Sequence, residues 1–241
     1  MGSTRHDPGI RRQIWLVGIL ALMAVILGGL LLMGRSSEAT AGGEAEPAAT
    51  GTMGPVGDQS RRISGDPLSM GPADAPVVMV EYSDYRCQFC GIYSRTIEPE
   101  LVEKYVNEGV LRIEWRDLAI FGPQSEAAAR AGRAAAEQGK FWEFNKAVYA
   151  KAPTGAGIRA NLTPEVLRDF AAEAGVPDLE RFDRDAASTK FDEAIDRDMM
   201  NARAIGLTST PAFIINGYPI LGAQPVENFE KIIEYAAEPS K

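Results

Sequence analysis

The sequence is poor in histidine and in cysteine. Its 241 residues include one histidine, His6, and two cysteines, Cys87 and Cys90. A catalytic triad that uses histidine needs an imidazole in the folded part of the chain, and His6 lies outside any segment expected to fold. A zinc site needs about four ligands, and the chain has no further cysteine and no usable histidine to complete one. The cysteine pair is therefore the main candidate for chemistry, and no metal or other cofactor is expected.

Positive charge is also scarce relative to negative charge. The formal net charge is -8 and the sequence pI is near 4.9. An acidic surface repels phosphate backbones, so we expect no role in binding nucleic acid. The length and the hydrophobic content of 45% allow one domain with a sizeable core, together with additional segments.

Ile14–Gly34 is an apolar run of 21 residues without a charged side chain. A helix of this length spans roughly 30 Å, the thickness of the hydrocarbon core of a bilayer. Arg5, Arg11 and Arg12 precede the run, so the positive-inside rule places residues 1–13 in the cytoplasm. We expect 14–34 to be a transmembrane signal-anchor in the cell membrane, with the rest of the chain on the extracytoplasmic side.

A cleaved signal peptide is the alternative, because Ala39-Thr40-Ala41 resembles a cleavage site. The apolar run is longer than the apolar region of an ordinary signal peptide, which favours an uncleaved anchor. Residues 35–66 are rich in Gly, Ala, Glu, Ser and Pro and have few large apolar side chains. Such a segment predicts a flexible linker, because it cannot bury enough surface to offset its ordering entropy.

Hydrophobic periodicity and turn residues predict an α/β domain over residues 67–237, in which a helical block at about 123–206 lies between the first strands and the last ones. Ser125 and Thr163 are candidate helix N-caps. In chain order the expected elements are a central strand at Val77–Tyr82, a helix from Cys90 to about Glu108 kinked at Pro99, a strand at Val110–Ala119, the helical block, a strand at Ala212–Ile215, a hairpin turn at Asn216-Gly217, a strand at Tyr218–Leu221 and a helix from Pro225 to about Ala237.

The two cysteines form a Cys-x-x-Cys motif, Cys87-Gln88-Phe89-Cys90, that follows the central strand and opens a helix. This spacing on a first helical turn brings the cysteines within bonding range. Backbone amides and the helix dipole favour an anion there, so we expect a lowered pKa for Cys87, the nucleophile. Cys90 is expected to be buried and to act as the resolving thiol. A structural disulfide and two inert core cysteines remain as alternatives.

Two further positions are unusual. Glu81 interrupts an otherwise apolar strand six residues before Cys87. It is either a charge at the strand end that reaches solvent, or a buried carboxyl with a raised pKa that exchanges a proton with Cys90. Thr210-Pro211 directly precedes an apolar strand and is either an ordinary turn or a cis-proline loop.

Three segments together resemble the DsbA-like branch of the thioredoxin superfamily: VVMVEYSDYRCQFC from Val77 to Cys90, QGKFWE from Gln138 to Glu143, and TSTPAFIING from Thr208 to Gly217. The similarity extends over about Gly65–Ala237. The resemblance implies a thioredoxin domain with an inserted helical domain. It also implies that members exchange disulfides in exported proteins.

The resemblance assigns further roles to individual residues. It implies that Cys87 is an exposed nucleophile, that Glu81 is the buried acid beside the resolving cysteine, and that Thr210 and Pro211 form a cis-proline loop that binds substrate peptide. Gln88 and Phe89, between the cysteines, are expected to contact the substrate as well. Strongly oxidising members carry a Pro-His pair at these two positions. The absence of that histidine predicts a weaker oxidant.

The sequence therefore predicts a protein disulfide oxidoreductase, most simply an oxidase. Its expected partners are exported proteins with cysteines and a membrane redox partner that recycles the disulfide. A reductase is the next alternative. An isomerase ranks lower, because the linker leaves no room for a dimerisation domain. An alternative of another class is a redox-inactive chaperone or binding module on the same fold.

Overall fold

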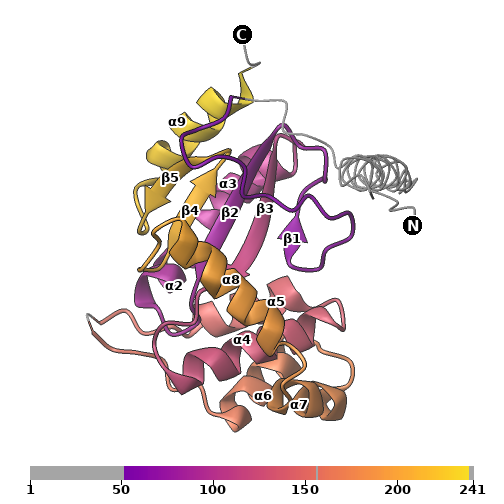
Figure 1. Ribbon diagram of the computed structural model, residues 1–241. Coiled ribbons are helices and arrows are strands. Elements are labelled where there is room, and N and C mark those ends of the chain that lie inside the picture. Colours follow the sequence, from indigo (N-terminus) through magenta and orange to yellow (C-terminus); the bar gives the residue numbers. More distant parts are fainter. Residues whose placement is uncertain (1–51, 156, 239–241) are drawn as a thin grey trace, which may run out of the picture. The chain divides into compact units, whose positions relative to one another are not determined.

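The computed structural model describes residues 52–155 and 157–238 (Figure 1). The predicted anchor at 14–34 and most of the predicted linker lie outside this range. No helix within the described residues combines the length and the apolar character needed to cross a bilayer. The elements are β1 (Ser69–Met70), β2 (Val77–Ser83), α2 (Gln88–Thr96), α3 (Glu98–Leu101), the π-helical turn η1 (Val102–Val106), β3 (Leu111–Asp117), α4 (Pro123–Ala136), α5 (Phe141–Ala150), α6 (Pro164–Glu173), α7 (Leu179–Ala187), α8 (Asp192–Ala204), β4 (Ala212–Ile215), β5 (Tyr218–Leu221) and α9 (Val226–Ala237).

The described strands form one mixed sheet in the order β1-β3-β2-β4-β5. β2 pairs parallel with β3 and antiparallel with β4, while β1 and β5 are antiparallel edge strands. β2 is buried along its whole length. Its run of valines and a methionine suits a central strand that is covered on both faces, as the sequence predicts.

Helices cover both faces of this sheet. Val77 and Met79 of β2 share a hydrophobic core with residues of α2, α3, η1 and α9, whereas Val78 and Val80 pack with Ala202 of α8. The alternation follows from the two-residue period of a strand. Figure 1 shows α8 crossing the front of the sheet. Glu81 has the parity of Val77 and Met79, so its side chain is on the α2 face.

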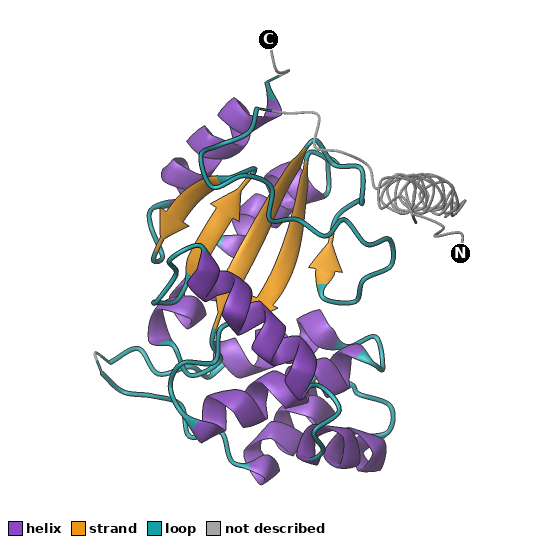
Figure 2. Cartoon of the chain, viewed as in Figure 1, coloured by secondary structure: helices purple, strands orange, loops and turns teal. Residues whose placement is uncertain are grey.

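Helices α4 to α8 lie between β3 and β4 in the chain, and α4 to α7 gather beyond one end of the sheet (Figure 2). Their shared core contains many alanines and aromatic rings. Tyr85 links this core to the sheet, since its ring centroid lies 5.2 Å from that of Trp115 on β3 and 5.8 Å from that of Phe144 on α5. The end of β2 that leads to the cysteines is therefore held between the sheet and the helical block.

The predicted helix from Cys90 to Glu108 differs from the observed one. The observed helix begins two residues earlier, at Gln88, and is divided at Ile97 into α2 and α3; α3 continues after Leu101 as the π-helical turn η1. Pro99 accounts for the division, because it lacks an amide hydrogen and is accommodated in the first turn of a new helix. Ser125 is not a helix cap. Gly122 holds that position with a φ of 88°, and the Ser125 hydroxyl donates to Asp84 instead.

Residues 52–66 also differ from the prediction of a flexible linker, because they contact the domain at specific points. The Arg61 and Arg62 amides donate to the Glu114 carboxylate, each at 2.8 Å. Arg62 is 4% exposed, and its guanidinium donates to the Ala75 carbonyl oxygen at 2.8 Å. Polar contacts to a buried carboxylate thus order a segment with few large apolar side chains. We call residues 52–66 the N-terminal strap.

Candidate functional site

The loop between β2 and α2 is fixed by Asp84. The Cys87 amide donates to the Asp84 carbonyl oxygen at 2.9 Å. The Asp84 carboxylate accepts hydrogen bonds from the Ser125 hydroxyl and from the Ile120 amide, each at 2.8 Å. These bonds join the loop, the β3–α4 connection and α4 at one side chain. They hold the residue that begins the Cys-x-x-Cys motif in a defined place.

Arg86 also holds this loop in place. Its guanidinium donates to the carbonyl oxygen of Phe121 at 2.7 Å and to that of Ala160 at 3.0 Å. Both acceptors belong to loops that flank helices of the insertion. The cysteine motif is therefore tied to the helical block as well as to the sheet.

Both cysteines are reduced and buried. Cys87 caps the N-terminus of α2 and is 3% exposed, and Cys90, in the first turn, is fully buried. Cys87 Sγ lies 3.2 Å from the Thr210 carbonyl oxygen, to which it donates when the thiol is protonated. The sequence prediction of an exposed Cys87 is therefore wrong, since the loop before β4 covers it. The exposed residue of the motif is Phe89, at 52%.

The environment separates the pKa values of the two thiols. The neighbouring Cys90 thiol is the largest influence on the pKa of Cys87 and lowers it to about 6, and the amides of Cys90 and Phe89 act in the same direction. Burial raises the pKa of Cys90, and the charge on Cys87 raises it further. At neutral pH this arrangement holds a thiolate at Cys87 and a thiol at Cys90. That is the division of roles that disulfide exchange requires.

Glu81 is buried near the end of β2, with 2% of its surface exposed. Its Oε1 accepts a hydrogen bond from the Ser83 hydroxyl at 2.6 Å. Its Oε2 has no partner among the described residues. Burial, and secondarily the charge of Glu98, raises the pKa of Glu81 well above its ordinary value. The sequence allowed two interpretations of Glu81, a strand-end charge that reaches solvent and a buried acid. In the structure Glu81 is a buried carboxyl.

The Thr210–Pro211 peptide bond is cis, and this loop lies against Cys87 through the Thr210 carbonyl. The Pro211 carbonyl oxygen accepts from the Gly222 amide at 2.8 Å, which connects the loop to the end of β5. Two polar side-chain atoms of this region, Thr210 Oγ1 and Gln88 Oε1, are buried without a hydrogen-bond partner in the described part of the chain. They are available to a group that enters beside the thiols.

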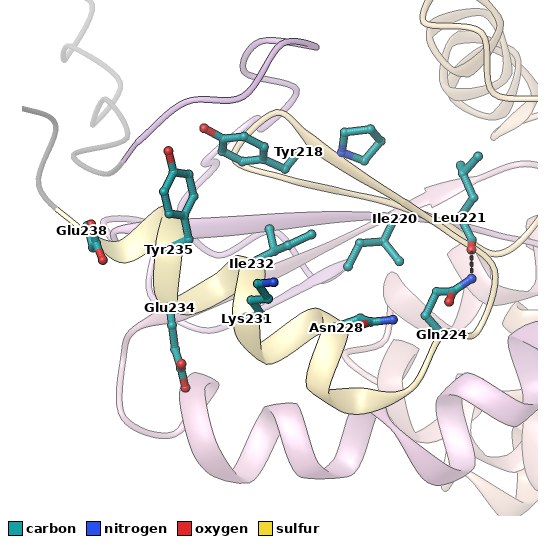
Figure 3. Close-up of a pocket in the computed structure, with 11 residues that line it drawn as sticks. Tyr218, Ile220, Leu221, Gln224, Asn228, Lys231, Ile232, Glu234, Tyr235 and Glu238 are labelled. Atoms are coloured by element: carbon teal, nitrogen blue, oxygen red, sulfur yellow. Dashed lines mark hydrogen bonds between the residues drawn. The ribbon is translucent and has the colours of Figure 1, made fainter.

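A groove of about 760 Å³ runs between β5 and α9 (Figure 3). Leu221 and Gln224 line the end of the groove that leads to the Pro211 loop, and Leu221 is 54% exposed. Tyr218 and Tyr235 line the other end, with their ring centroids 5.5 Å apart. β5 is the last strand of the sheet. An apolar groove along an edge strand is a surface that can receive an extended peptide.

The sequence analysis named the cysteines, Glu81 and the Thr210–Pro211 loop. The structure brings Cys87 against the Thr210–Pro211 loop and buries Glu81 two residues before Ser83, whose hydroxyl donates to it. The sequence analysis did not identify Asp84 or Glu98. Asp84 carries a local signal, because an Asp that accepts from the amide two residues later is a common turn-forming arrangement; here Arg86 donates at 2.7 Å. Glu98 lies eight residues after Cys90 and has only helical periodicity as a signal.

Comparison with known proteins agrees with this geometry. A family model described as thioredoxin matches residues 64–235. The chain belongs to the thioredoxin family. The resemblance to the thioredoxin superfamily drawn from the sequence is thereby confirmed, and so is the thioredoxin-like α/β fold. The range matched by the family model includes all the site residues named above.

Solved structures of DsbA-type proteins share this fold. BdbD from Bacillus subtilis, in its oxidised form, aligns with a TM-score of 0.68 at 23% identity, over 77% of this chain and 99% of that one. The alpha-DsbA1 protein of Wolbachia pipientis aligns with a TM-score of 0.62 at 23% identity, over 73% and 92% of the two chains. At these identities the likeness shows the fold alone.

Curated relatives include two kinds of protein. A "probable disulfide bond formation protein D" of Bacillus cereus is 29% identical over 153 residues, which cover 62% of this chain and 69% of the relative. A "Na(+)/H(+) antiporter NhaA 1" of a Mycobacterium species (strain KMS) is 33% identical over 176 residues, which cover 71% of this chain. The match spans about a quarter of that antiporter, 26% of its length. The similarity thus concerns a thioredoxin-like part of a longer protein.

Proposed function

We propose that the chain is a thiol–disulfide oxidoreductase that exchanges its Cys87–Cys90 pair with cysteines of exported proteins, acting as an oxidase. The observation that carries the proposal is the pairing of a Cys87 thiol whose pKa is lowered to about 6 with a fully buried Cys90. A stabilised thiolate favours the reduced form of the pair, and a pair that prefers to be reduced is an oxidant.

In the oxidised protein, a substrate thiolate attacks Cys87 Sγ, and the Cys87–Cys90 bond breaks. Cys90 leaves with the electron pair and takes a proton from the Glu81 carboxyl group. A second substrate thiolate then attacks the substrate sulfur of the mixed disulfide. Cys87 leaves as a thiolate, and its low pKa makes it a good leaving group. The substrate loses two electrons and the cysteine pair gains them.

The groups around the thiols suit a peptide substrate. We assign Thr210, Pro211, Gln88 and Phe89 to substrate binding. Phe89 offers an exposed apolar surface, and the buried oxygens of Thr210 and Gln88 offer hydrogen-bond partners. The groove between β5 and α9 extends this surface for residues that flank the substrate cysteine. Oxidation of the reduced pair by a membrane redox partner completes the cycle, and the predicted anchor at 14–34 would keep the domain on the extracytoplasmic side near that partner.

A trapping experiment tests the exchange activity. Cys90→Ser leaves Cys87 unable to resolve a mixed disulfide internally, so the full-length variant expressed in cells should accumulate mixed disulfides with exported proteins that dithiothreitol releases. The double variant Cys87→Ser, Cys90→Ser is the matched control and should trap none. Absence of trapped proteins with Cys90→Ser would contradict the proposal.

The direction of catalysis depends on the reduction potential against glutathione. Because the pKa of Cys87, about 6, lies between that of thioredoxin, about 7, and that of DsbA, about 3.5, we expect a potential between about −270 and −120 mV. A potential at or below about −270 mV would overturn the assignment as an oxidase and identify a reductase.

A further inference from the structure

The groove between β5 and α9 has two walls that are held separately. β5 is the last strand of the sheet and pairs with β4. α9 packs on the sheet through Phe229, whose ring centroid lies 4.9 Å from that of Phe213 on β4. No hydrogen bond between described residues joins β5 directly to α9. The separation of the two walls therefore depends on what connects their ends.

At one end of the groove the chain itself connects the walls. Residues 222–225 run directly from β5 to α9. The Gly222 amide donates to the Pro211 carbonyl oxygen at 2.8 Å, and the carbonyl oxygen of Thr210 lies 3.2 Å from Cys87 Sγ. This end of the groove is therefore fixed beside the reactive thiol.

At the other end the N-terminal strap is bonded to α9. The Thr52 amide donates to the Ala236 carbonyl oxygen at 3.0 Å, and the Thr52 hydroxyl donates to the Glu238 carbonyl oxygen at 3.2 Å. The last carbonyl groups of a helix have no partner within the helix, so a donor from elsewhere in the chain stabilises its last turn. That turn of α9 carries Tyr235, which lines the groove.

Two residues further on, the strap is bonded to the turn between β4 and β5. The Gly54 amide donates to the Asn216 carbonyl oxygen at 2.7 Å, and the Val56 amide donates to the Gly217 carbonyl oxygen at 3.1 Å. A β-carbon at residue 54 would lie 2.5 Å from the Gly217 carbonyl carbon and 2.7 Å from Tyr218 Cγ. The strap can therefore keep these bonds only with glycine at this position.

The strap thus reaches both walls of the groove at the end away from Cys87. Figure 3 shows Tyr218 and Tyr235 at this end, one from each wall, and their ring centroids are 5.5 Å apart. The Tyr105 hydroxyl donates to Glu234 of α9 at 2.8 Å, but this bond connects α9 to η1 and not to the hairpin. A binding surface that is already held in its bound shape loses less conformational entropy when it binds a peptide.

We infer that residues 52–56 are a clamp that holds the two walls of the groove at the separation an extended peptide needs. Thr52 and Gly54 are then positioning residues for protein substrates. The inference rests on the proposed function, in which the groove binds residues that flank the substrate cysteine. The clamp acts on peptide binding and not on the exchange of sulfur bonds, so a dithiol too small to reach the groove should be oxidised equally well without it.

The test compares two substrates of the full-length protein, with glutathione disulfide as the terminal oxidant. One is a synthetic peptide with two cysteines flanked by apolar residues, and the other is dithiothreitol. Gly54→Ala places a methyl group against the Gly217 backbone and should lift the clamp from the hairpin. We expect KM for the peptide to rise about fivefold, with kcat for the peptide and the oxidation of dithiothreitol unchanged. Met53→Ala, at an exposed neighbouring position, is the matched control and should behave as the wild type.

A variant at the other end of the clamp tests whether the two ends act as one unit. Thr52→Pro removes both the amide hydrogen and the hydroxyl that bond to α9. Either variant alone should open the clamp, so the double variant Thr52→Pro, Gly54→Ala should raise KM by about the same fivefold. Independent effects on two separate walls would instead multiply to about twenty-fivefold, which would overturn the clamp.

The remaining outcomes separate the clamp from the proposed function. A wild-type protein that oxidises the peptide, with Gly54→Ala and Thr52→Pro equal to Met53→Ala, would overturn the clamp alone. Equal losses for the peptide and for dithiothreitol would show that the strap only stabilises the domain, which would also overturn the clamp. A wild-type protein that oxidises neither substrate would overturn the proposed function.

Discussion

At the scale of single residues, the site shifts the pKa values of one acid and two thiols away from their ordinary values. Cys87 is stabilised as an anion at neutral pH, while Glu81 and Cys90, both buried, are held neutral. The difference arises from position: Cys87 is at a helix N-terminus, with amides and a thiol directed at it, whereas the other two lie deeper, where a charge is not solvated. A buried carboxyl kept neutral is suited to protonate a leaving thiolate.

Glu81→Gln should change how stability depends on pH. A folded pKa raised above the unfolded value means that the folded state binds more protons, so stability falls as pH rises from about 4.5 toward the folded pKa of Glu81, by about 1.4 kcal/mol per pH unit. Glu81→Gln in the oxidised protein, where neither cysteine titrates, should remove this slope. Urea denaturation at several pH values measures it. An unchanged slope would indicate that Glu81 ionises in the folded protein as it does in water.

The sequence could identify site residues of a type that is unusual at their position. The only two cysteines of the chain are three positions apart, and Glu81 is an acid in an apolar strand. The sequence could not show that Cys87 is covered, because the covering carbonyl of Thr210 is 123 residues away in the chain. Asp84 and Glu98 were missed for a similar reason. Each is an ordinary acidic residue until the fold brings its partners from other elements.

At the scale of elements, the strands and most helices follow the sequence because their patterns are local. The Asn216-Gly217 turn joins β4 and β5 as predicted, and Thr163 caps α6 by accepting from the Val166 amide. Elements set by tertiary contacts were not predicted. β1 has two residues, which is too short for any periodicity, and it exists because Ser69 and Met70 pair with β3.

Leu221→Asp should separate binding of protein substrates from thiol chemistry. The side chain is 54% exposed at the end of the groove that leads to the Pro211 loop, so folding should be little affected. The charge should disfavour apolar peptide in the groove and lower kcat/KM for a protein substrate about tenfold, with oxidation of dithiothreitol unchanged. Ile63→Asp, an exposed apolar residue of the N-terminal strap, is the control. Equal losses for both substrates, or for neither, would show that the groove does not bind substrate.

At the scale of the whole molecule, a buried network of charged groups joins the N-terminal strap to the sheet. Glu114 is fully buried and accepts from the Arg112 guanidinium at 2.8 Å and from the Arg116 guanidinium at 2.7 Å, in addition to two amides of the strap. Burial alone would disfavour its charge, but Arg112 and Arg116 lower the pKa of Glu114 to about 2. Sequence composition predicted a linker here because it cannot reveal hydrogen bonds between Arg61 or Arg62 and Glu114, which are 53 and 52 positions apart in the chain.

Glu114→Gln should destabilise the domain and release the strap. It leaves buried Arg112 and Arg116 without a counter-charge, which typically costs about 3–5 kcal/mol. Trypsin should then cleave after Arg61 or Arg62 faster than in the wild type, and the free energy of unfolding should fall by that amount. Glu103→Gln, at an exposed position of η1, controls for the loss of charge. Wild-type stability and cleavage in Glu114→Gln would contradict this account of the strap.

The claim on which the account depends is that one thiol of the reduced pair ionises near neutral pH and the other does not. Ultraviolet absorbance of the thiolate, followed across a pH titration of the reduced protein, tests this directly. The account predicts one thiolate appearing with a midpoint near pH 6, a transition that Cys87→Ser removes while Cys90 stays protonated. A first transition near the ordinary value for cysteine, about 8.5, would contradict it.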